Sequence, residues 1–263
     1  MPERLPRFTK DQIGTSAVRF PSGVPMPSMT DAAVDPYAKT RVSKEVLVEG
    51  LLFGPQEKGP FPGMVLLHEA WGLTAQIKNL GSRLAQEGYV VLIPNLYSRQ
   101  GGMVTANEEI ANALAARVKE TDLLQDISSC CEFLNTRDHV MRNIHGVIGF
   151  GLGGALAMRF ACQRKRLRAA VAFYATPPTP PTVLNDLVCP LLYHQAGADT
   201  RVPADSAEQL RQTAKTTGKQ VEIRTYAGTP HAFMNEAKPD SYRPEAANEA
   251  WEATIQFLSQ HLK

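Results

Sequence analysis

The chain has 263 residues, which is enough for one large α/β domain or two small ones. Hydrophobic residues make up 43% and charged residues 21%, as is typical of a globular protein. The formal net charge is only +2, so we expect no nucleic-acid partner, and no apolar run is long enough to span a bilayer. The N-terminus lacks the apolar core of a secretory signal, and a cytoplasmic location is therefore expected.

Residues 1–40 are rich in proline, serine and threonine and show little periodicity. We interpret them as an N-terminal extension that lies over one domain, residues 41–263, or is partly disordered. Within that domain strands and helices alternate. Apolar runs bounded by turn residues predict strands at Lys44–Phe53, Gly63–His68, Tyr89–Ile93, Val147–Phe150, Ala169–Tyr174, Leu191–Tyr193 and Val221–Tyr226. Helical spacing predicts helices at Ala75–Glu87, 107–119, Leu123–Leu134, Ala155–Gln163, Ala204–Thr216 and Glu245–Leu262.

This alternation predicts an α/β fold with a mainly parallel sheet covered by helices on both faces. In such sheets ligands bind beyond the carboxyl ends of the strands. Reactive side chains are therefore expected at four strand ends, residues 68–69, 150–151, 196–199 and 228–231.

Between a predicted strand and a predicted helix stands the run Gly149-Phe150-Gly151-Leu152-Gly153-Gly154. A sharp turn of this kind carries the nucleophile of many hydrolases, and small residues flank it because the strand and the helix approach closely. Gly149 and Gly153 supply the small residues here. The central position is Gly151, which tolerates the strained backbone but has no side chain with which to attack a carbonyl.

The same glycines also spell GxGxxG, which is a dinucleotide-binding pattern. That interpretation requires an acidic residue about 20 positions later to bind the ribose hydroxyls. No aspartate or glutamate occurs between Gly151 and Asp186, and the motif lies in the middle of the predicted sheet order. The cysteines form no CxxC pair, and we interpret all four as small buried hydrophobic residues. Neither a cofactor nor a metal is expected.

Several segments resemble the dienelactone hydrolase family. They are PGMVLLHEAWGL and GYVVLIPNLYSRQ within residues 62–100, and then VIGFGLGGALAM, LLYHQAGADTRVP and TYAGTPHAFMNE. The resemblance extends from about residue 41 to the end of the chain, and the order of the motifs is more specific than any one of them. It implies an α/β-hydrolase fold and a small-molecule substrate.

The resemblance also implies roles for individual residues. The family's nucleophile, a cysteine or sometimes a serine, falls on Gly151, its acid on Asp199 and its histidine on His231. A glutamate that helps to control the ionisation of the nucleophile falls on Glu69.

Further roles concern the backbone and the rim of the site. The resemblance places the oxyanion hole at the backbone N–H groups of Ala70 and Leu152. Three aromatic side chains near strand ends either line the substrate pocket or fill the rim of the core: Trp71, Tyr97 and Tyr174.

The chain departs from the family pattern in two places. The nucleophile is absent, and no arginine matches the one with which the founding enzymes bind the carboxylate of dienelactone. The corresponding helix region, residues 107–112, carries Glu108 and Glu109 instead. Dienelactone itself is therefore not the expected substrate.

Each candidate also has an ordinary explanation. Asp199 resembles a turn or cap aspartate, a lone loop histidine such as His231 is usually exposed, and Glu69 could be a surface residue at a strand tip. The chain order of elbow, acid and histidine favours the catalytic interpretation. His68 should point to the opposite side of its strand from Glu69, and we expect it to be a packed histidine.

Three functions remain open. The chain could hydrolyse a small ester, lactone or related carbonyl compound with His231 activating water directly. It could instead run proton-transfer chemistry as a lyase, isomerase or cyclase, with His231 or Glu69 as the base. It could also be a binding protein that has lost catalysis. A fourth explanation is that Gly151 is a deliberate substitution for a natural nucleophile.

Overall fold

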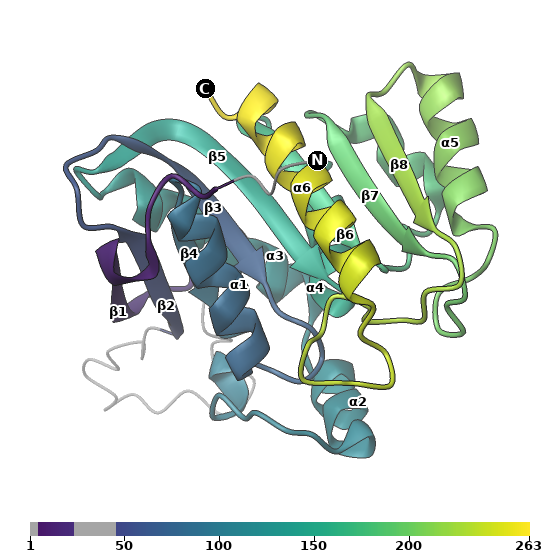
Figure 1. Ribbon diagram of the computed structural model, residues 1–263, viewed down its shortest axis with the longest axis horizontal. Coiled ribbons are helices and arrows are strands. Elements are labelled where there is room, and N and C mark those ends of the chain that lie inside the picture. Colours follow the sequence, from purple (N-terminus) through teal and green to yellow (C-terminus); the bar gives the residue numbers. More distant parts are fainter. Residues whose placement is uncertain (1–4, 24–45) are drawn as a thin grey trace, which may run out of the picture.

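The computed structural model describes residues 5–23 and 46–263, whose strands form one sheet with helices on both sides (Figure 1). The sheet has eight strands in the order β1-β2-β4-β3-β5-β6-β7-β8. Neighbours from β4 through β8 are parallel, whereas β1 and β2 are antiparallel to their neighbours. The bounds are β1 Ile13–Pro21, β2 Leu47–Pro55, β3 Phe61–Leu67, β4 Val90–Pro94, β5 Val140–Phe150, β6 Leu167–Phe173, β7 Leu191–Ala196 and β8 Val221–Tyr226. The expected α/β fold is confirmed.

The helices cover the sheet in two layers. The α-helices are α1 Ala75–Gln86, α2 Glu108–Arg117, α3 Glu120–Asn135, α4 Leu152–Ala161, α5 Ser206–Thr217 and α6 Pro244–His261. Short 3-10 helices are η1 Lys10–Gln12, η2 Ser98–Gln100 and η3 Pro181–Asp186. α1 and α6 pack in one apolar cluster against the near face in Figure 1, and α3, α4 and α5 pack in a second cluster against the far face.

The burial pattern of each strand follows from this layering. All five residues of β4 are buried, as are most of β3 and β6, because helices cover both of their faces. β1 at the edge is largely exposed and buries Phe20 alone. None of the helices within residues 5–23 and 46–263 is long and apolar enough to cross a membrane.

β1 lies inside residues 1–40, which the sequence analysis interpreted as an extension that lies over the domain or is partly disordered. That expectation is wrong for Ile13–Pro21, which pairs with β2 from Ile13↔Pro55 to Pro21↔Leu47. An edge strand is held by backbone hydrogen bonds to one partner, so a run without regular apolar alternation can form it. The rest of the proposed extension, residues 1–4 and 24–40, and the predicted start of the domain at residue 41 lie outside the described residues.

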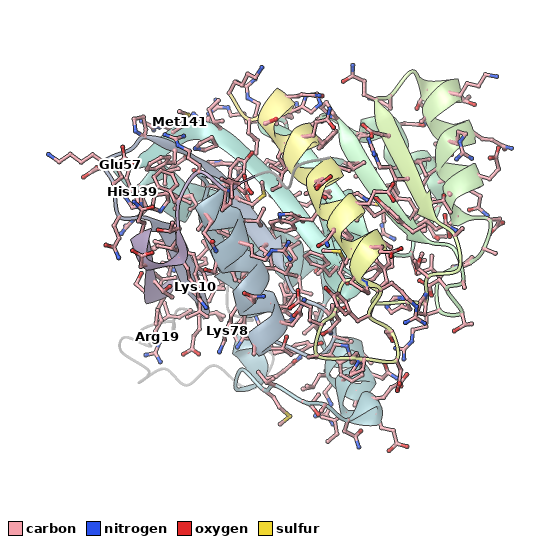
Figure 2. The ribbon with its side chains drawn as sticks, in the orientation of Figure 1. Lys10, Arg19, Glu57, Lys78, His139 and Met141 are labelled. Carbon is pink, nitrogen blue, oxygen red and sulfur yellow. The ribbon has the colours of Figure 1, made fainter. Side chains whose placement is uncertain are left out.

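The parallel strands bring their carboxyl ends to one edge of the sheet, toward the loops in the lower part of Figure 1. β5 is longer than predicted and begins at Val140 rather than Val147. Its start lies at the opposite edge, where His139 and Met141 are labelled in Figure 2. The four strand ends singled out in the sequence therefore meet at one edge, as expected.

Candidate active site

The turn between β5 and α4 has the backbone that a catalytic elbow requires. Gly151 has φ 51° and ψ −113°, a conformation that residues with side chains rarely adopt. Its N–H donates to the Phe173 carbonyl at 3.0 Å, and its carbonyl accepts from the Ala155 N–H at 3.0 Å. These two bonds hold the turn between the neighbouring strand β6 and the first turn of α4.

The flanking glycines permit a very close contact between strand and helix. A Cβ at Gly149 would overlap the carbonyl of Gly153, and a Cβ at Gly153 would overlap the carbonyl of Leu67. The predicted need for small residues at these positions is confirmed. A Cβ at Gly154 would press on Ala175 at 2.7 Å, so protein packing accounts for Gly149 and Gly154 of the GxGxxG pattern without a phosphate ligand.

The structure brings His231 and Asp199 together from two loops that follow different strands. His231 Nδ1 lies 2.8 Å from Asp199 Oδ2. The other carboxylate oxygen, Oδ1, accepts the backbone N–H groups of Arg201 at 2.8 Å and Val202 at 3.1 Å. Burial alone would raise the pKa of Asp199, but the hydrogen bonds from His231 and from these backbone groups lower it overall. Asp199 thus remains ionised and can hold the imidazole with Nε2 facing the elbow.

The missing side chain of Gly151 would point at His231. An ideal Cβ there lies 3.7 Å from His231 Nε2, and the next nearest atom is Cγ of Glu69 at 4.0 Å. His231 Nε2 has no hydrogen-bond partner among the described residues. A side chain at position 151 would therefore begin in ordinary van der Waals contact with His231 and Glu69, without a clash.

Glu69 is buried beneath the elbow, with 5% of its surface exposed. Asn235 Nδ2 donates to its Oε2 at 3.3 Å. Burial raises the pKa of Glu69, although the charges of His231 and Lys238 and the hydroxyl of Tyr174 partly offset this rise. The space beside Glu69 and Asn235 is too small to hold a water molecule. A buried carboxyl group in this setting holds its proton to higher pH than an exposed one.

Two backbone N–H groups belong to the residues that directly follow Glu69 and Gly151 in the chain. The N–H groups of Ala70 and Leu152 have no hydrogen-bond partner among the described residues. Both residues are partly exposed. Leu152 opens α4, where free N–H groups and the helix dipole favour negative charge. Their assignment as an oxyanion hole stays a prediction.

The three aromatic candidates have different environments. Tyr174 has a positive φ of 35° and sets its ring at 5.0 Å, edge to face, from His231. Trp71 is 9% exposed, and the ammonium of Lys238 lies 3.3 Å from its ring centroid. Tyr97 is completely buried, and its hydroxyl donates to the Ala70 carbonyl at 2.9 Å. We therefore correct the expectation for Tyr97, because it holds a loop and has no surface to offer a substrate.

Sequence reasoning missed Lys238 and Asn235. Both lie in the loop between His231 and α6, where no periodicity marks individual positions. Burial lowers the pKa of Lys238, and the nearby carboxyl group of Glu69 opposes that fall. A cation thus stands at the rim of the site beside Trp71.

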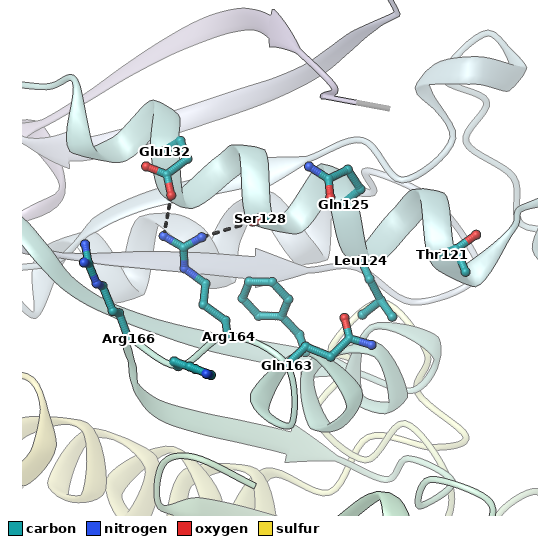
Figure 3. A pocket seen from close by; sticks show the side chains of 10 residues that line it. Thr121, Leu124, Gln125, Ser128, Glu132, Gln163, Arg164 and Arg166 are labelled. Carbon is teal, nitrogen blue, oxygen red and sulfur yellow. Dashed lines mark hydrogen bonds and ion pairs between the residues drawn. The ribbon is translucent and has the colours of Figure 1, made fainter. Parts of the chain in front are cut away.

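The larger hollows of the molecule lie elsewhere. Figure 3 shows a groove of about 540 Å³ between α3 and the turn after α4, at the edge opposite to the elbow. Its Arg164 already donates to Glu132 at 2.7 Å and to Ser128 at 3.0 Å. This groove contains none of the candidate site residues. Within residues 5–23 and 46–263, no group of three or more His, Cys, Asp or Glu side chains could hold a metal ion.

Comparison with known proteins agrees with this geometry. The model of the dienelactone hydrolase family matches residues 48–262. The chain belongs to the dienelactone hydrolase family. This family of hydrolases has the enzyme class and the fold that the sequence resemblance implied.

Curated relatives of this family member are 27–30% identical to it over most of their length. A Yersinia pestis protein provisionally named carboxymethylenebutenolidase is 30% identical over 217 residues, which cover 78% of this chain and 80% of that protein. An Aquifex aeolicus protein with the same provisional name is 30% identical over 227 residues, which cover 83% of this chain and 95% of that protein. These relatives mark the chain as a dienelactone hydrolase-like hydrolase.

Solved structures support the fold. A provisionally named dienelactone hydrolase from Klebsiella pneumoniae aligns with a TM-score of 0.77 at 24% identity, covering 94% of this chain and 99% of its own. A dienelactone hydrolase-like promiscuous phosphotriesterase from metagenomic libraries aligns with a TM-score of 0.79 at 16% identity, covering 96% of this chain and 100% of its own.

Proposed function

We propose that this dienelactone hydrolase-family protein hydrolyses a small ester, lactone or related carbonyl compound by direct attack of water. The observation that carries the proposal is the open position at Gly151, where an added Cβ would lie 3.7 Å from His231 Nε2. A water oxygen within hydrogen-bond reach of that nitrogen, about 2.8 Å away, occupies the place of the usual nucleophile.

The proposed reaction has no covalent intermediate. The water oxygen attacks the carbonyl carbon while His231 Nε2 takes one of its protons, and the carbonyl π electrons move to oxygen. Asp199, bonded to Nδ1 at 2.8 Å, stabilises the imidazolium that forms. When the tetrahedral intermediate collapses, the bond to the leaving oxygen breaks and that oxygen receives the proton from His231. An ester gives an acid and an alcohol, and a lactone gives one hydroxy acid.

The oxyanion of that intermediate would accept the N–H groups of Ala70 and Leu152. Donors that are fixed before the reaction stabilise developing charge without reorganisation, and one such donor contributes about 10²–10³-fold in rate. Glu69 lies beneath the elbow with a raised pKa, because it is buried. In its neutral form it places no negative charge beside the oxyanion.

Substrate contacts are proposed for the two aromatic residues that border this space. Trp71 and the ring of Tyr174 would flank a small acyl group on either side of the elbow. Tyr174 is 2% and Trp71 9% exposed, so each would present only an edge of its ring to a substrate.

The test is hydrolysis of short aryl esters and simple lactones by the wild-type protein and by His231→Ala and Asp199→Asn. We expect each substitution to lower kcat/KM by about 100-fold or more, because the base is removed or left unsupported. His139→Ala is the matched control, since His139 lies at the opposite edge of the sheet (Figure 2) and should keep full activity.

Activity that is unchanged in His231→Ala would overturn the proposal. A parallel incubation in deuterated water distinguishes the proton-transfer alternative, which predicts exchange of the substrate's α-proton without hydrolysis. A protein that binds these compounds but neither hydrolyses nor exchanges them would have the binding function instead.

A further inference from the structure

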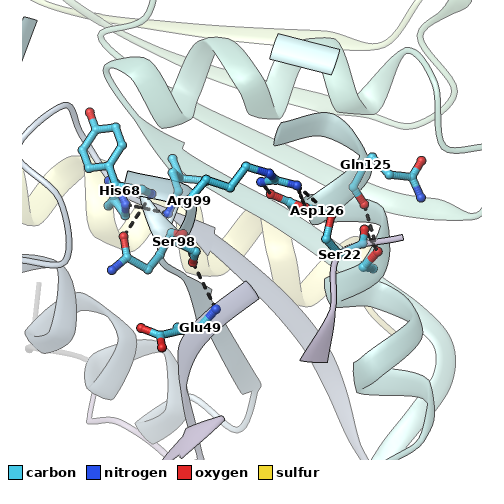
Figure 4. A network of polar contacts seen from close by, with 11 residues as sticks. Ser22, Glu49, His68, Ser98, Arg99, Gln125 and Asp126 are labelled. Carbon is cyan, nitrogen blue, oxygen red and sulfur yellow. Dashed lines mark hydrogen bonds and ion pairs between the residues drawn. The ribbon is translucent and has the colours of Figure 1, made fainter. Parts of the chain in front are cut away.

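The two peptide groups beside Ala70 are held by buried side chains. The ring nitrogen Nδ1 of His68 lies 2.6 Å from the carbonyl oxygen of Glu69. The hydroxyl of Tyr97 donates to the carbonyl oxygen of Ala70 at 2.9 Å. Both rings are completely buried and lie 5.2 Å apart between centroids. Figure 4 shows His68 within this network of polar contacts.

The tautomer of His68 follows from its second contact. The backbone N–H of Leu96 donates to Nε2 of His68 at 3.0 Å, so Nε2 carries no proton. The proton of the neutral ring is therefore on Nδ1, and it is donated to the Glu69 carbonyl. Burial lowers the pKa of His68 to about 4, which keeps the ring neutral at ordinary pH.

Because a peptide group is planar, the contact between His68 and the Glu69 carbonyl also sets the direction of the Ala70 N–H. The Glu69 carbonyl and the Ala70 N–H belong to one peptide, which is not among the cis peptides of the described chain. In a trans peptide the two groups point in opposite directions. Because the carbonyl points at the buried His68 ring, the N–H of Ala70 points away from it, on the side where Ala70 is partly exposed.

We infer that His68, with Tyr97, is a positioning residue that orients the N–H of Ala70 as an oxyanion donor. This inference rests on the proposed function, which assigns that N–H its role. His68 never touches the substrate. It binds the Glu69 carbonyl, which also accepts the Gly72 N–H at 3.2 Å, and Tyr97 binds the Ala70 carbonyl of the next peptide.

The loop that carries Tyr97 and Leu96 is itself firmly held, as the positioning role requires. Asn95 Oδ1 accepts the Tyr97 N–H at 3.0 Å, and the Asn95 N–H donates to the Glu49 carbonyl at 2.7 Å. Arg99, in the same loop, forms a two-pronged ion pair with buried Asp126 on α3 (Figure 4). The orientation of the donor is thereby tied to β2 and α3.

The test separates the two nitrogens of His68. His68→Leu removes both contacts. His68→Asn keeps a donor at the position of Nδ1, whereas His68→Gln keeps an acceptor for the Leu96 N–H but loses the donor to Glu69. We expect kcat to fall about 10- to 100-fold in His68→Leu and His68→Gln with KM nearly unchanged, and to recover in His68→Asn. Tyr97→Phe, which keeps the ring, should give a smaller fall of the same kind.

Binding of a tetrahedral anion distinguishes a positioning role of His68 from a purely structural one, because only the positioning role affects how the Ala70 N–H meets the anion. Methylphosphonate mimics the oxyanion, and its binding should shift the backbone amide resonances of both Ala70 and Leu152 in the wild-type protein. In His68→Leu the shift at Ala70 should be lost and that at Leu152 kept. His145→Leu is the matched control, since His145 is another buried histidine with a pKa lowered by burial to about 4, and it lies in the middle of β5.

The outcomes distinguish this inference from the proposed function. If the wild-type protein hydrolyses esters but His68→Leu keeps its kcat and the Ala70 shift, the inference is wrong and the function stands. If the wild-type protein hydrolyses none of the substrates, the proposed function is wrong, and the inference about His68 is then judged from the amide shifts alone. Loss of the Ala70 shift in His68→Leu would support the inference, and its retention, or its absence from the wild-type protein, would overturn it.

Discussion

Replacing Gly151 by cysteine should restore a reactive nucleophile to this protein. The new Cβ meets no atom closer than 3.7 Å, so the substitution is not blocked by a clash. The cost is backbone strain, because φ is 51° and ψ is −113°. A residue with a side chain in such a conformation costs about 1–3 kcal/mol, which a domain of this size can absorb.

Gly218→Cys provides the matched control for that strain. Gly218 follows α5 with φ 67°, and a Cβ there meets nothing within 4 Å. The left-handed conformation costs an ordinary residue about 1–2 kcal/mol. Both variants should therefore melt a few degrees below the wild-type protein, and only Gly151→Cys places its thiol beside a histidine.

The native cysteines should react only slowly with a thiol reagent such as iodoacetamide. All four are buried, and burial raises the pKa of Cys131 to about 12, of Cys162 to about 11 and of Cys189 to about 12. At Gly151 the thiol would lie at the N-terminus of α4 and near His231 Nε2, and both features lower a cysteine pKa below its ordinary value of about 8.5.

The assay is the rate of iodoacetamide labelling between pH 5 and 8, followed by intact mass. We expect Gly151→Cys to react faster than Gly218→Cys at the acidic end, and to release a stoichiometric burst of phenolate from an activated aryl ester. Adding His231→Ala should abolish the burst and reduce the labelling advantage to the part that the N-terminus of α4 provides. If the thiol at Gly151 reacts no faster than the thiol at Gly218 and gives no burst, the reasoning about the elbow and the base is refuted.

Three further predictions concern stability. Gly149→Ala should destabilise the fold by about 3 kcal/mol or more, measured by urea unfolding, because its Cβ would overlap the Gly153 carbonyl. Glu69→Gln should raise the melting temperature more at pH 8 than at pH 4: the raised pKa of Glu69 means that its burial penalty is absent below the unfolded pKa, about 4.3, and grows as pH rises through the folded value. Arg99→Met should cost about 3–5 kcal/mol by leaving the buried Asp126 carboxylate unpaired, and the double variant with Asp126→Leu should recover much of that loss.

Much of this fold is predictable because buried parallel strands leave a plain signal. The run Val90–Pro94 is wholly apolar and is buried on both faces, so its assignment needs no tertiary information. β1 gave no such signal, since only Phe20 of its residues is buried and the strand is held largely by backbone pairing with β2. The early residues of β5 were missed for a related reason, because they are only partly buried at the amino edge of the sheet.

The site residues likewise fall into those that local sequence predicts and those that only tertiary contacts reveal. Gly151, Asp199 and His231 could be placed because the elbow and the order of the motifs are local features of the sequence, and the structure brings them together. The contacts of His68 and Tyr97 depend on a neighbouring loop and could not be read from their own positions. A buried histidine and a buried tyrosine look like core residues until the direction of each hydrogen bond is known.

The central claim, direct attack by water beside Gly151, is tested most directly by a single turnover in ¹⁸O-labelled water with the protein in excess over an ester substrate. Direct attack predicts one ¹⁸O in the carboxyl group of every product molecule, with the mass of the protein unchanged throughout. An unlabelled first product, with ¹⁸O instead in the peptide that contains Glu69 or Asp199, would mean that a carboxylate attacks the substrate and would contradict the account.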